Sequence, residues 1–322
     1  MDAELSKIYQ HYSFVSPIVD EDIFQKYFKP TGRTLVVSSP NLLALCKRKG
    51  IQSDYLKCGK ENPLIVSKYQ SQNGLYDTVI GDLEDKSPSH PFQTIHDPSY
   101  MHYLRDGFDR HLKDNGKIIC KLPLVALRYF SEKNKKGIPF YLRMNITKLF
   151  IHSSDEYVIA TIEKKEYCGK TNIQYNDSHK VINCNIHETI LSPSYDEQIF
   201  SLIQSYLKDS DLKDYVHYER LGGPEIKKGL NIKIREKYND RGLVMYTNSK
   251  KIKFDLLESA TLTSSSIIYI FEDKETRDEY YQIINKKGIV DLISSLSYNN
   301  TIPHNIIPFV LHPATVEYAK SL

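Results

Sequence analysis

The residues best placed to do chemistry lie in the loop that follows an apolar segment, Tyr76–Ile80. This loop is rich in Pro, Ser and His. It contains Asp82, whose carboxylate can accept hydrogen bonds, and Phe92, whose ring can stack. In an open parallel sheet, ligands bind at the carboxyl ends of the strands. We therefore expect any catalytic or binding site of this region at residues 81–93.

The elements around this loop predict a strand–helix–strand unit. From about Ser99 to His111 apolar residues recur at helical spacing, which predicts a helix. A turn at Lys113–Gly116 then leads into a second apolar strand, Lys117–Pro123. A unit of this length is a right-handed crossover between parallel strands. Both strands should therefore end at the same edge of one sheet.

Other segments extend this sheet. Pro40 and Gly50 bracket a predicted helix, and a second helix is expected at 124–132. Four polar residues separate the last two strong strands, which favours an antiparallel hairpin. The first half is thus predicted as an α/β domain with a mostly parallel sheet and a terminal antiparallel hairpin. Its remaining strands are expected at 34–38, 51–56, 146–152 and 157–163.

Residues 76–163 resemble the adenine-N6 DNA methyltransferases of restriction–modification systems. In that family a strand like Tyr76–Ile80 leads into Gly-Asn-Pro-Pro-Phe or Gly-Asn-Pro-Pro-Tyr, and a helix, a glycine-containing turn and an apolar strand follow. Residues 112–123 are similar to that turn and strand, and the hairpin at 146–163 is similar to the family's final strand pair. The resemblance covers residues 12–165 and implies a Rossmann-like, methyltransferase-type fold.

The resemblance implies catalytic roles for Asp82 and Phe92. In the family an Asn or Asp side chain accepts a hydrogen bond from the adenine amine, and an aromatic residue stacks on the flipped base. Asp82 stands at the Asn position, but the three residues after it replace the two prolines and the aromatic residue. The segment His90–Gln93 resembles the missing part, which makes Phe92 the candidate for stacking. Alternatively, Asp82 caps a strand end and Phe92 anchors the loop in the core.

The resemblance also implies the cofactor S-adenosylmethionine. The family uses a glycine-rich turn after the first strand, because the backbone must approach the methionine moiety closely. Here that turn runs from Ser38 to Asn41 without glycine, and these two residues are the candidate cofactor ligands. An acidic residue at the end of the second strand binds the ribose hydroxyls in the family, and Asp54 is the candidate.

Both departures from the family pattern indicate weakened or absent methyl transfer, so three functions stay open. The first is S-adenosylmethionine-dependent adenine-N6 methylation of DNA, or a diverged derivative. The second is a catalytically inactive homologue that binds DNA or an active partner methyltransferase subunit. The third is another α/β transferase, such as a glycosyltransferase acting on modified DNA.

The second half is predicted as a smaller α+β, DNA-contacting domain. We expect a methyltransferase-like domain at 1–170, a connection at 171–195 and the second domain at 196–322. Its helices are expected at 194–210, 273–284 and 288–297, with strands at 251–256 and 266–271.

A basic segment supports DNA contact by this domain. Between Ile226 and Phe254 there are nine Lys or Arg residues and only two acids. Alternation in Leu230–Arg235 predicts a strand with basic side chains on one face. Two such faces could neutralise several phosphates, and the alternative is a solvated sheet face. The candidate DNA ligands are Lys227, Lys228, Lys233, Arg235, Lys251 and Lys253.

Composition excludes several other classes. The 322 residues are 40% apolar and 26% charged with a net charge of +3, which is typical of a soluble two-domain protein. No run of 18 apolar residues and no secretory leader is present, so no membrane partner is expected. Five scattered cysteines without a Cys-x-x-Cys pair favour a reducing cytoplasm and no zinc site. The histidines have no metal-binding spacing, and no nucleophile-elbow, phosphate-loop or His-Glu-x-x-His motif occurs.

Overall fold

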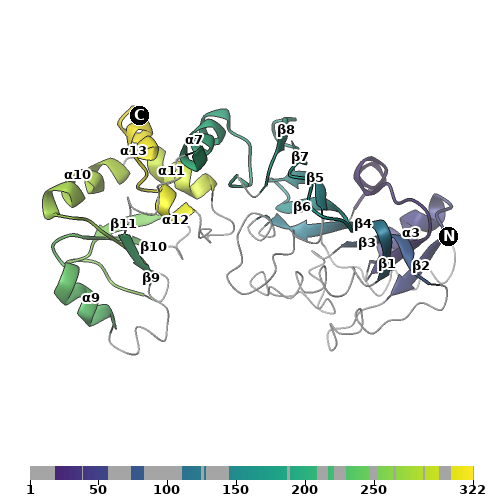
Figure 1. Ribbon diagram of the computed structural model, residues 1–322, viewed down its shortest axis with the longest axis horizontal. Helices are drawn as coiled ribbons and strands as arrows, with labels where there is room; N and C mark the ends of the chain where they lie inside the picture. The colour runs from purple at the N-terminus through teal and green to yellow at the C-terminus, as the bar shows by residue number, and fades with distance from the viewer. Residues whose placement is uncertain are drawn as a thin grey trace. The chain divides into compact units, whose positions relative to one another are not determined.

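The computed structural model describes residues 19–37, 39–56, 74–82, 111–124, 127, 145–186, 189–208, 217–220, 230–246, 252–263, 266–285, 287–296 and 306–321. The chain divides into two compact units, Met1–His187 and Glu188–Leu322. Each unit contains its own sheet, and Figure 1 labels most of the strands and helices.

The first unit is built on one large sheet. Its strands are β1 (Thr34–Val37), β2 (Ser53–Leu56), β3 (Tyr76–Asp82), β4 (Leu112–Pro123), β5 (Asn145–His152), β6 (Tyr157–Glu163), β7 (Thr171–Tyr175) and β8 (Val181–Cys184). They lie in the order β2-β1-β3-β4-β6-β5-β7-β8. Strands β1 to β4 pair in parallel, whereas β6 is antiparallel to both β4 and β5. This order confirms the predicted α/β fold, a mostly parallel Rossmann-like sheet with an antiparallel hairpin of β5 and β6, although β7 and β8 extend the sheet beyond the hairpin.

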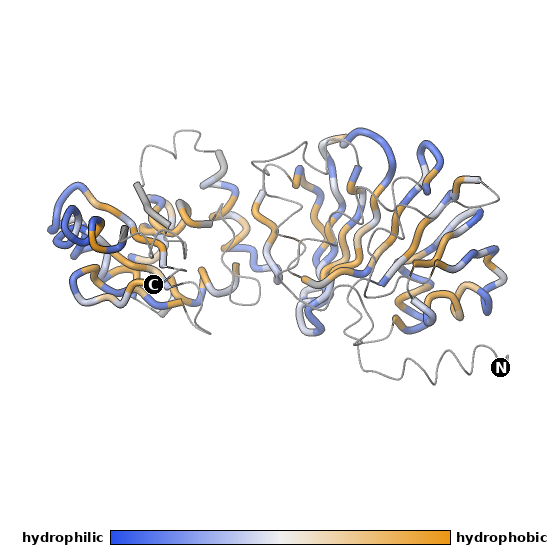
Figure 2. The backbone as a smooth tube through the Cα atoms, turned by 90° about the horizontal axis from the view of Figure 1, so that it is seen from below, coloured by the Kyte–Doolittle hydropathy of each residue, from blue (hydrophilic) through white to orange (hydrophobic). Residues whose placement is uncertain are grey.

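One face of this sheet packs against the helices near the N-terminus. These are α2 (Glu21–Ile23), the π-helix η1 (Phe24–Phe28) and α3 (Pro40–Arg48). Val36, Ile80 and Ile119, from three neighbouring strands, share a buried cluster with side chains of η1 and α3. Figure 2 shows apolar residues along the strands and hydrophilic residues in many of the connecting turns. The pairing of strands thus buries an apolar face that the short helices cover.

Helix α3 begins at the carboxyl end of β1, and local chemistry decides where it starts and stops. The Oγ atom of Ser39 accepts a hydrogen bond from the Leu42 amide at 3.3 Å, which caps the first turn. Pro40 occupies the first helical position, where a missing N–H costs nothing. Gly50 follows the helix with a φ of 66°, a left-handed conformation that favours glycine.

The turn expected at Lys113–Gly116 is a bulge inside β4. Tyr76 pairs with Leu112, but Thr78 pairs with Lys117, so the residues between them in β4 are looped out of register. Asn115 has a φ of 61° at this point. The helix predicted at 99–111 lies outside the described residues, apart from its last position, as does nearly all of the one at 124–132.

Residues 171–184, which were expected in a connection, instead extend the large sheet. Strand β7 pairs in parallel with β5, and β8 pairs antiparallel with β7. The reason is visible in the alternation of β7, where Thr171, Ile173 and Tyr175 are buried and the residues between them are half-buried. The first compact unit therefore ends at residue 187 rather than at 170.

The second unit is an α+β domain with a four-stranded antiparallel sheet in the order β11-β10-β12-β9. The strands are β9 (His217–Arg220), β10 (Gly242–Tyr246), β11 (Lys253–Leu256) and β12 (Ser266–Ile270). The helices are α7 (Glu197–Lys208), α9 (Leu230–Tyr238), α10 (Lys274–Ile284), α11 (Lys287–Ser295), α12 (Ile306–Phe309) and α13 (Pro313–Ser321). The larger core lies between one face of the sheet and helices α7 and α10–α13, and α9 covers the other face (Figure 1).

The segment Leu230–Arg235 was predicted as a strand and is instead part of the helix α9. Its apolar and basic residues alternate, but Ile234 alone among its described side chains is buried, against Val244 and Ile268 of the sheet. Ile232, expected on the same buried strand face, is 58% exposed. A strand would bury Ile232 and Ile234 on the same face, whereas the helix turns Ile232 away from the sheet that Ile234 contacts.

Candidate active site

The carboxyl ends of β1, β3 and β4 lie side by side, and this edge carries the candidate site. Val37, the last residue of β1, pairs with Gly81 of β3, and Gly81 pairs with Cys120 of β4. Asp82 comes directly after Gly81, so it lies beside the point where β1 ends and the chain leads into α3. The sheet brings the expected catalytic position and the expected cofactor turn to neighbouring strands, as the sequence predicts.

Asp82 is largely buried and contacts a buried lysine. It pairs in register with Lys121 of β4, and the Lys121 Nζ atom lies 3.8 Å from Asp82 Oδ2. The side chain of Asp82 is 11% exposed and that of Lys121 is 1% exposed. At such a site neither charge is tolerable without the other, because water cannot solvate them. The pair thus places a carboxylate and an ammonium group together at the edge of the sheet.

The charge of Asp82 also affects the thiol of Cys120, the residue before Lys121 in β4. Cys120 is fully buried in β4, and burial together with the negative charge of Asp82 raises the pKa of its thiol far above the usual range. The thiol is therefore protonated at any physiological pH and cannot act as a nucleophile. Cys46 of α3 behaves alike, since burial raises the pKa of its thiol to about 11.

Aromatic side chains continue the row beyond Lys121. The Lys121 Nζ atom lies 4.8 Å from the centre of the Tyr157 ring, and this ring stacks on His152 at a centroid distance of 4.8 Å. Ring nitrogens of His152 lie 2.9 Å from Asn176 Nδ2 and 3.2 Å from Ser154 Oγ. The row Asp82–Lys121–Tyr157–His152 thus runs from β3 across β4 and β6 to β5. The contacts of His152 hold its ring against Tyr157.

Two of the predicted cofactor residues, Ser38 and Asn41, belong to the turn between β1 and α3. Asn41 lies in the first turn of α3, and its Nδ2 atom donates to the Val19 carbonyl at 2.7 Å, so it ties the N-terminal segment to this edge. Ser38 lies outside the described residues, while its neighbour Ser39 caps α3. Their roles as cofactor ligands stay predictions.

Asp54 has structural partners at the opposite end of the strands. It pairs with Leu35, near the start of β1, and its carboxylate accepts hydrogen bonds from Arg33 and, at 2.7 Å, from Tyr76 Oη. Burial alone would raise the pKa of Asp54, but the hydrogen bonds from Tyr76 and Arg33 outweigh burial and lower it. Arg33 and Tyr76 stand at the amino ends of β1 and β3. The ribose role of Asp54 stays a prediction, and this geometry accounts for the carboxylate without it.

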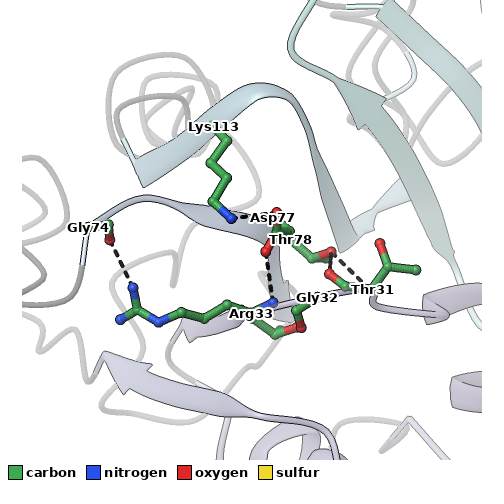
Figure 3. Close-up of polar contacts among 8 residues, drawn as sticks. Thr31, Gly32, Arg33, Gly74, Asp77, Thr78 and Lys113 are labelled. Atoms are coloured by element: carbon green, nitrogen blue, oxygen red, sulfur yellow. Dashed lines mark hydrogen bonds and ion pairs between the residues drawn. The ribbon is translucent and has the colours of Figure 1, made fainter.

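The amino edge of the same strands is held by a polar network (Figure 3). Asp77 of β3 accepts hydrogen bonds from the Arg33 amide at 2.9 Å and from Lys113 Nζ at 2.7 Å. The Thr78 hydroxyl donates to the Thr31 carbonyl at 2.8 Å. Lys113 stands in the bulge of β4, so this network fixes the bulge and the start of β1 against β3.

Three of the predicted DNA ligands lie in the part of the second unit that the structure describes. Arg235 of α9 donates to the carbonyls of Leu257, at 2.9 Å, and Ala260, so it holds a turn of the chain. Lys253 of β11 is exposed and forms an ion pair with Asp255 at 2.8 Å. Lys233 is exposed on α9. Lys227, Lys228 and Lys251 lie outside the described residues.

Lys237 is an exposed cation that the strand prediction did not select. Residues four apart share one side of a helix, so α9 places Lys233 and Lys237 together. A helical interpretation of Leu230–Tyr238 would have found this pair from the sequence. DNA binding by these residues stays a prediction.

The site residues that sequence reasoning missed are Lys121, Tyr157 and His152. A signal for Lys121 was present, because a lysine in the apolar strand Lys117–Pro123 requires a partner. Phe92 and the rest of the loop at 83–110 lie outside the described residues. Within the described ranges, no cluster of His, Cys, Asp or Glu could hold a metal, and no helix is long and apolar enough to cross a membrane.

Comparison with known proteins finds structural similarity without sequence similarity. No family model and no curated protein matches the chain. Similar structures include the phosphoethanolamine N-methyltransferase 2 of Haemonchus contortus, at 12% identity and a TM-score of 0.29, over 51% of this chain and 37% of that one. A modification subunit of a putative type I restriction enzyme from Vibrio vulnificus is 9% identical, with a TM-score of 0.34 over 54% of this chain and 50% of the other.

A putative class I S-adenosylmethionine-dependent methyltransferase from Listeria monocytogenes is 11% identical, with a TM-score of 0.32 over 54% of this chain and 70% of the other. The chain spans half or less of the first two proteins, 37% and 50% of their lengths. Resemblance at these TM-scores assigns no activity to the chain.

Proposed function

We propose that the first unit is an S-adenosylmethionine-dependent methyltransferase that acts on the adenine amine of DNA, or a diverged derivative of one. The observation that supports the proposal is the pairing of Val37 with Gly81, which sets Asp82 beside the turn from β1 into α3. A ligand held at this turn and a ligand held by Asp82 would lie next to each other. Group transfer between two bound ligands needs this proximity.

The residues at the edge suit the cofactor in one respect. The N-terminus of α3 follows β1 directly, and a helix N-terminus carries partial positive charge that favours a carboxylate such as that of the methionine moiety. When bound, S-adenosylmethionine would supply an electrophilic methyl group. Asn41 would keep the N-terminal segment over this end of the sheet through its bond to Val19.

Asp82 would then orient the target amine. Its carboxylate accepts hydrogen bonds and cannot donate them while it is ionised. An amine that donates to Asp82 turns its nitrogen lone pair away from the carboxylate and toward the neighbouring ligand. Phe92 would stack on the base, as the family resemblance implies.

DNA would be held in part by the second unit. The exposed pair Lys233 and Lys237 on α9 offers two positive charges to the phosphate backbone. Replacing both by Gln should weaken binding of duplex DNA and reduce the dependence of log Kd on log salt by about two units of slope. Arg235→Gln is an unsuitable probe, because that side chain holds carbonyls in the fold.

Titration calorimetry with S-adenosylmethionine and a methyl-transfer assay on DNA test the catalytic proposal. Asp82→Asn keeps an acceptor oxygen but loses the charge, so it should lower transfer by less than Asp82→Ala, which should lower it by about a hundredfold or more, as the loss of one charged hydrogen bond at a reacting group does. Asp77→Asn, on the same strand but at its opposite end, is the matched control and should transfer normally. Absence of cofactor binding by the wild-type chain would refute the proposal.

A second function is favoured by two observations. The turn from β1 to α3 has Pro40 where an amide could meet the cofactor, and Asp82 is already held by Lys121. Both fit a homologue that keeps the fold and binds DNA or an active methyltransferase subunit without catalysis. DNA affinity that persists in a chain without measurable cofactor binding would support this function instead.

A further inference from the structure

The chain retains a buried lysine inside an apolar strand, directly below the edge that carries the proposed site. Its neighbours in β4, Ile119, Cys120 and Leu122, are buried and apolar or neutral. Replacing a buried ion pair by apolar residues is often neutral or stabilising for a protein, so burial alone gives no reason to keep such a pair. A role for the charge itself gives one.

We propose that Lys121 is a positioning residue that keeps the Asp82 carboxylate ionised and holds one of its oxygens, so that this site accepts an N–H or O–H donor and rejects a carbonyl or carboxylate. The inference deepens the proposed methyl transfer and rests on it for the identity of the ligand. Lys121 does not touch the ligand in this proposal, because its side chain is 1% exposed.

The contacts of Lys121 place its ammonium group beside one oxygen of Asp82, Oδ2. The Lys121 Nζ atom lies 3.8 Å from Asp82 Oδ2, within the range of an ion pair, and 4.8 Å from the centre of the Tyr157 ring. An ammonium between a carboxylate and the face of a ring is attracted to both. His152 stacks on that ring, so the position of Lys121 is fixed from β6 and β5 as well as from β3.

The charge state of Asp82 decides what the site can recognise. An ionised carboxylate has only acceptor sites, whereas a protonated one can also donate to a carbonyl. With Lys121 beside it, the ionised form is favoured. The exocyclic amine of adenine presents a donor, and the 6-oxo group of hypoxanthine presents an acceptor. The site should therefore distinguish these two bases.

Four titratable or charged groups on the described elements are linked to Asp82 by contacts that the structure shows. They are Lys121 and Cys120 of β4, Tyr157 of β6 and His152 of β5. Cys120 stays protonated, because burial and the charge of Asp82 raise the pKa of its thiol. Lys121 is the cation that the structure places against Asp82, so its removal changes the charge next to that carboxylate.

The test measures the ionisation of Asp82 directly. In the full chain labelled with ¹³Cγ-aspartate, the Asp82 signal is assigned with Asp82→Asn and followed against pH. In Lys121→Met its titration midpoint should rise by about one to three pH units, the effect of removing an opposite charge at this range. Lys121→Arg keeps the charge and should leave the midpoint near its wild-type value. Lys117→Met, a half-buried lysine of the same strand that donates to the Lys29 carbonyl at 3.0 Å, is the matched control.

The same variants are then assayed for methyl transfer to DNA containing adenine across the pH range. The acidic limb of the rate profile should move with the titration midpoint in Lys121→Met and stay in place in the two controls. An unchanged midpoint in folded Lys121→Met would overturn the role of Lys121, whatever the activity. A shifted midpoint with an unmoved rate profile would overturn the need for an ionised Asp82. A shifted midpoint with no transfer by the wild type would reject the proposed function and its ligand, and leave only the electrostatic role.

Discussion

Removing the carboxylate of Asp82 should leave a buried positive charge, and its cost can be worked from the structure. Lys121 is 1% exposed, so its ammonium cannot turn to water when Asp82 becomes Ala. Breaking a buried pair by removal of one partner costs about 3–5 kcal/mol. The Nζ–Oδ2 distance of 3.8 Å is long for a direct ion pair, and the Tyr157 ring still faces the ammonium. We therefore expect about 3 kcal/mol, near the lower end of that range.

The double variant, Asp82→Ala with Lys121→Met, measures the coupling free energy between the two side chains. In Lys121→Met the same strand position becomes apolar and no charge remains to be compensated. Asp82→Ala should then cost about 1 kcal/mol in the Lys121→Met background, so the coupling between the two substitutions is about 2 kcal/mol. This coupling corresponds to a factor of about 30 in the local opening equilibrium.

Hydrogen exchange is the suitable assay, because the chain has two compact units and need not unfold in one step. Mass spectrometry of peptides from β3 and β4 reports the opening of the strands that hold the pair. Peptides from β10 and β12 in the second unit serve as the internal reference. If Asp82→Ala changes the protection of β4 by less than about 1 kcal/mol, and the two substitutions are additive, the buried-charge reasoning is wrong.

Three further predictions concern the frame around the site. Gly32 and Gly50 both have left-handed φ values, 64° and 66°, but only at Gly32 would a new Cβ lie 2.5 Å from the Asp77 carboxylate. Gly32→Ala should therefore cost about 1–3 kcal/mol more in unfolding free energy than Gly50→Ala. Equal costs in urea titrations would contradict this. The hydrogen bond from Lys113 lowers the pKa of Asp77, so its small stabilising contribution is present above about pH 4 and disappears as the pH falls through the folded pKa. Asp77→Asn should therefore be less stable than wild type at pH 7 and equal to it near pH 2, as measured by thermal unfolding. The buried guanidinium of Arg277 pairs with the carboxylates of Glu258 and Asp278, at 2.5 and 2.6 Å. Arg277→Ala should therefore destabilise the second unit by about 3–5 kcal/mol. A loss below about 1 kcal/mol in the hydrogen-exchange protection of α10 would show that the pairs are dispensable.

Short-range pattern was sufficient to predict most of the elements. Apolar runs located β1 and β3, a proline and a glycine bounded α3, and four polar residues indicated the β5–β6 hairpin. A strand–helix–strand unit joins parallel strands, so the parallel pairing of β3 and β4 also followed from the sequence. With that pairing, the sequence alone places Asp82 at the carboxyl edge of the sheet.

Other features depended on contacts between residues far apart in the chain, and no local pattern contains those. Asp54 meets Arg33 and Tyr76 because β2 pairs with β1 in one particular register, and a shift of that register would free its carboxylate. The alternation in Leu230–Arg235 fits a strand, yet the segment is helical and packs on the second sheet through Ile234. Lys121 could be recognised as unusual from its apolar neighbours. That its partner is Asp82 was decided only by the folded sheet, because strand register sets which side chains become neighbours.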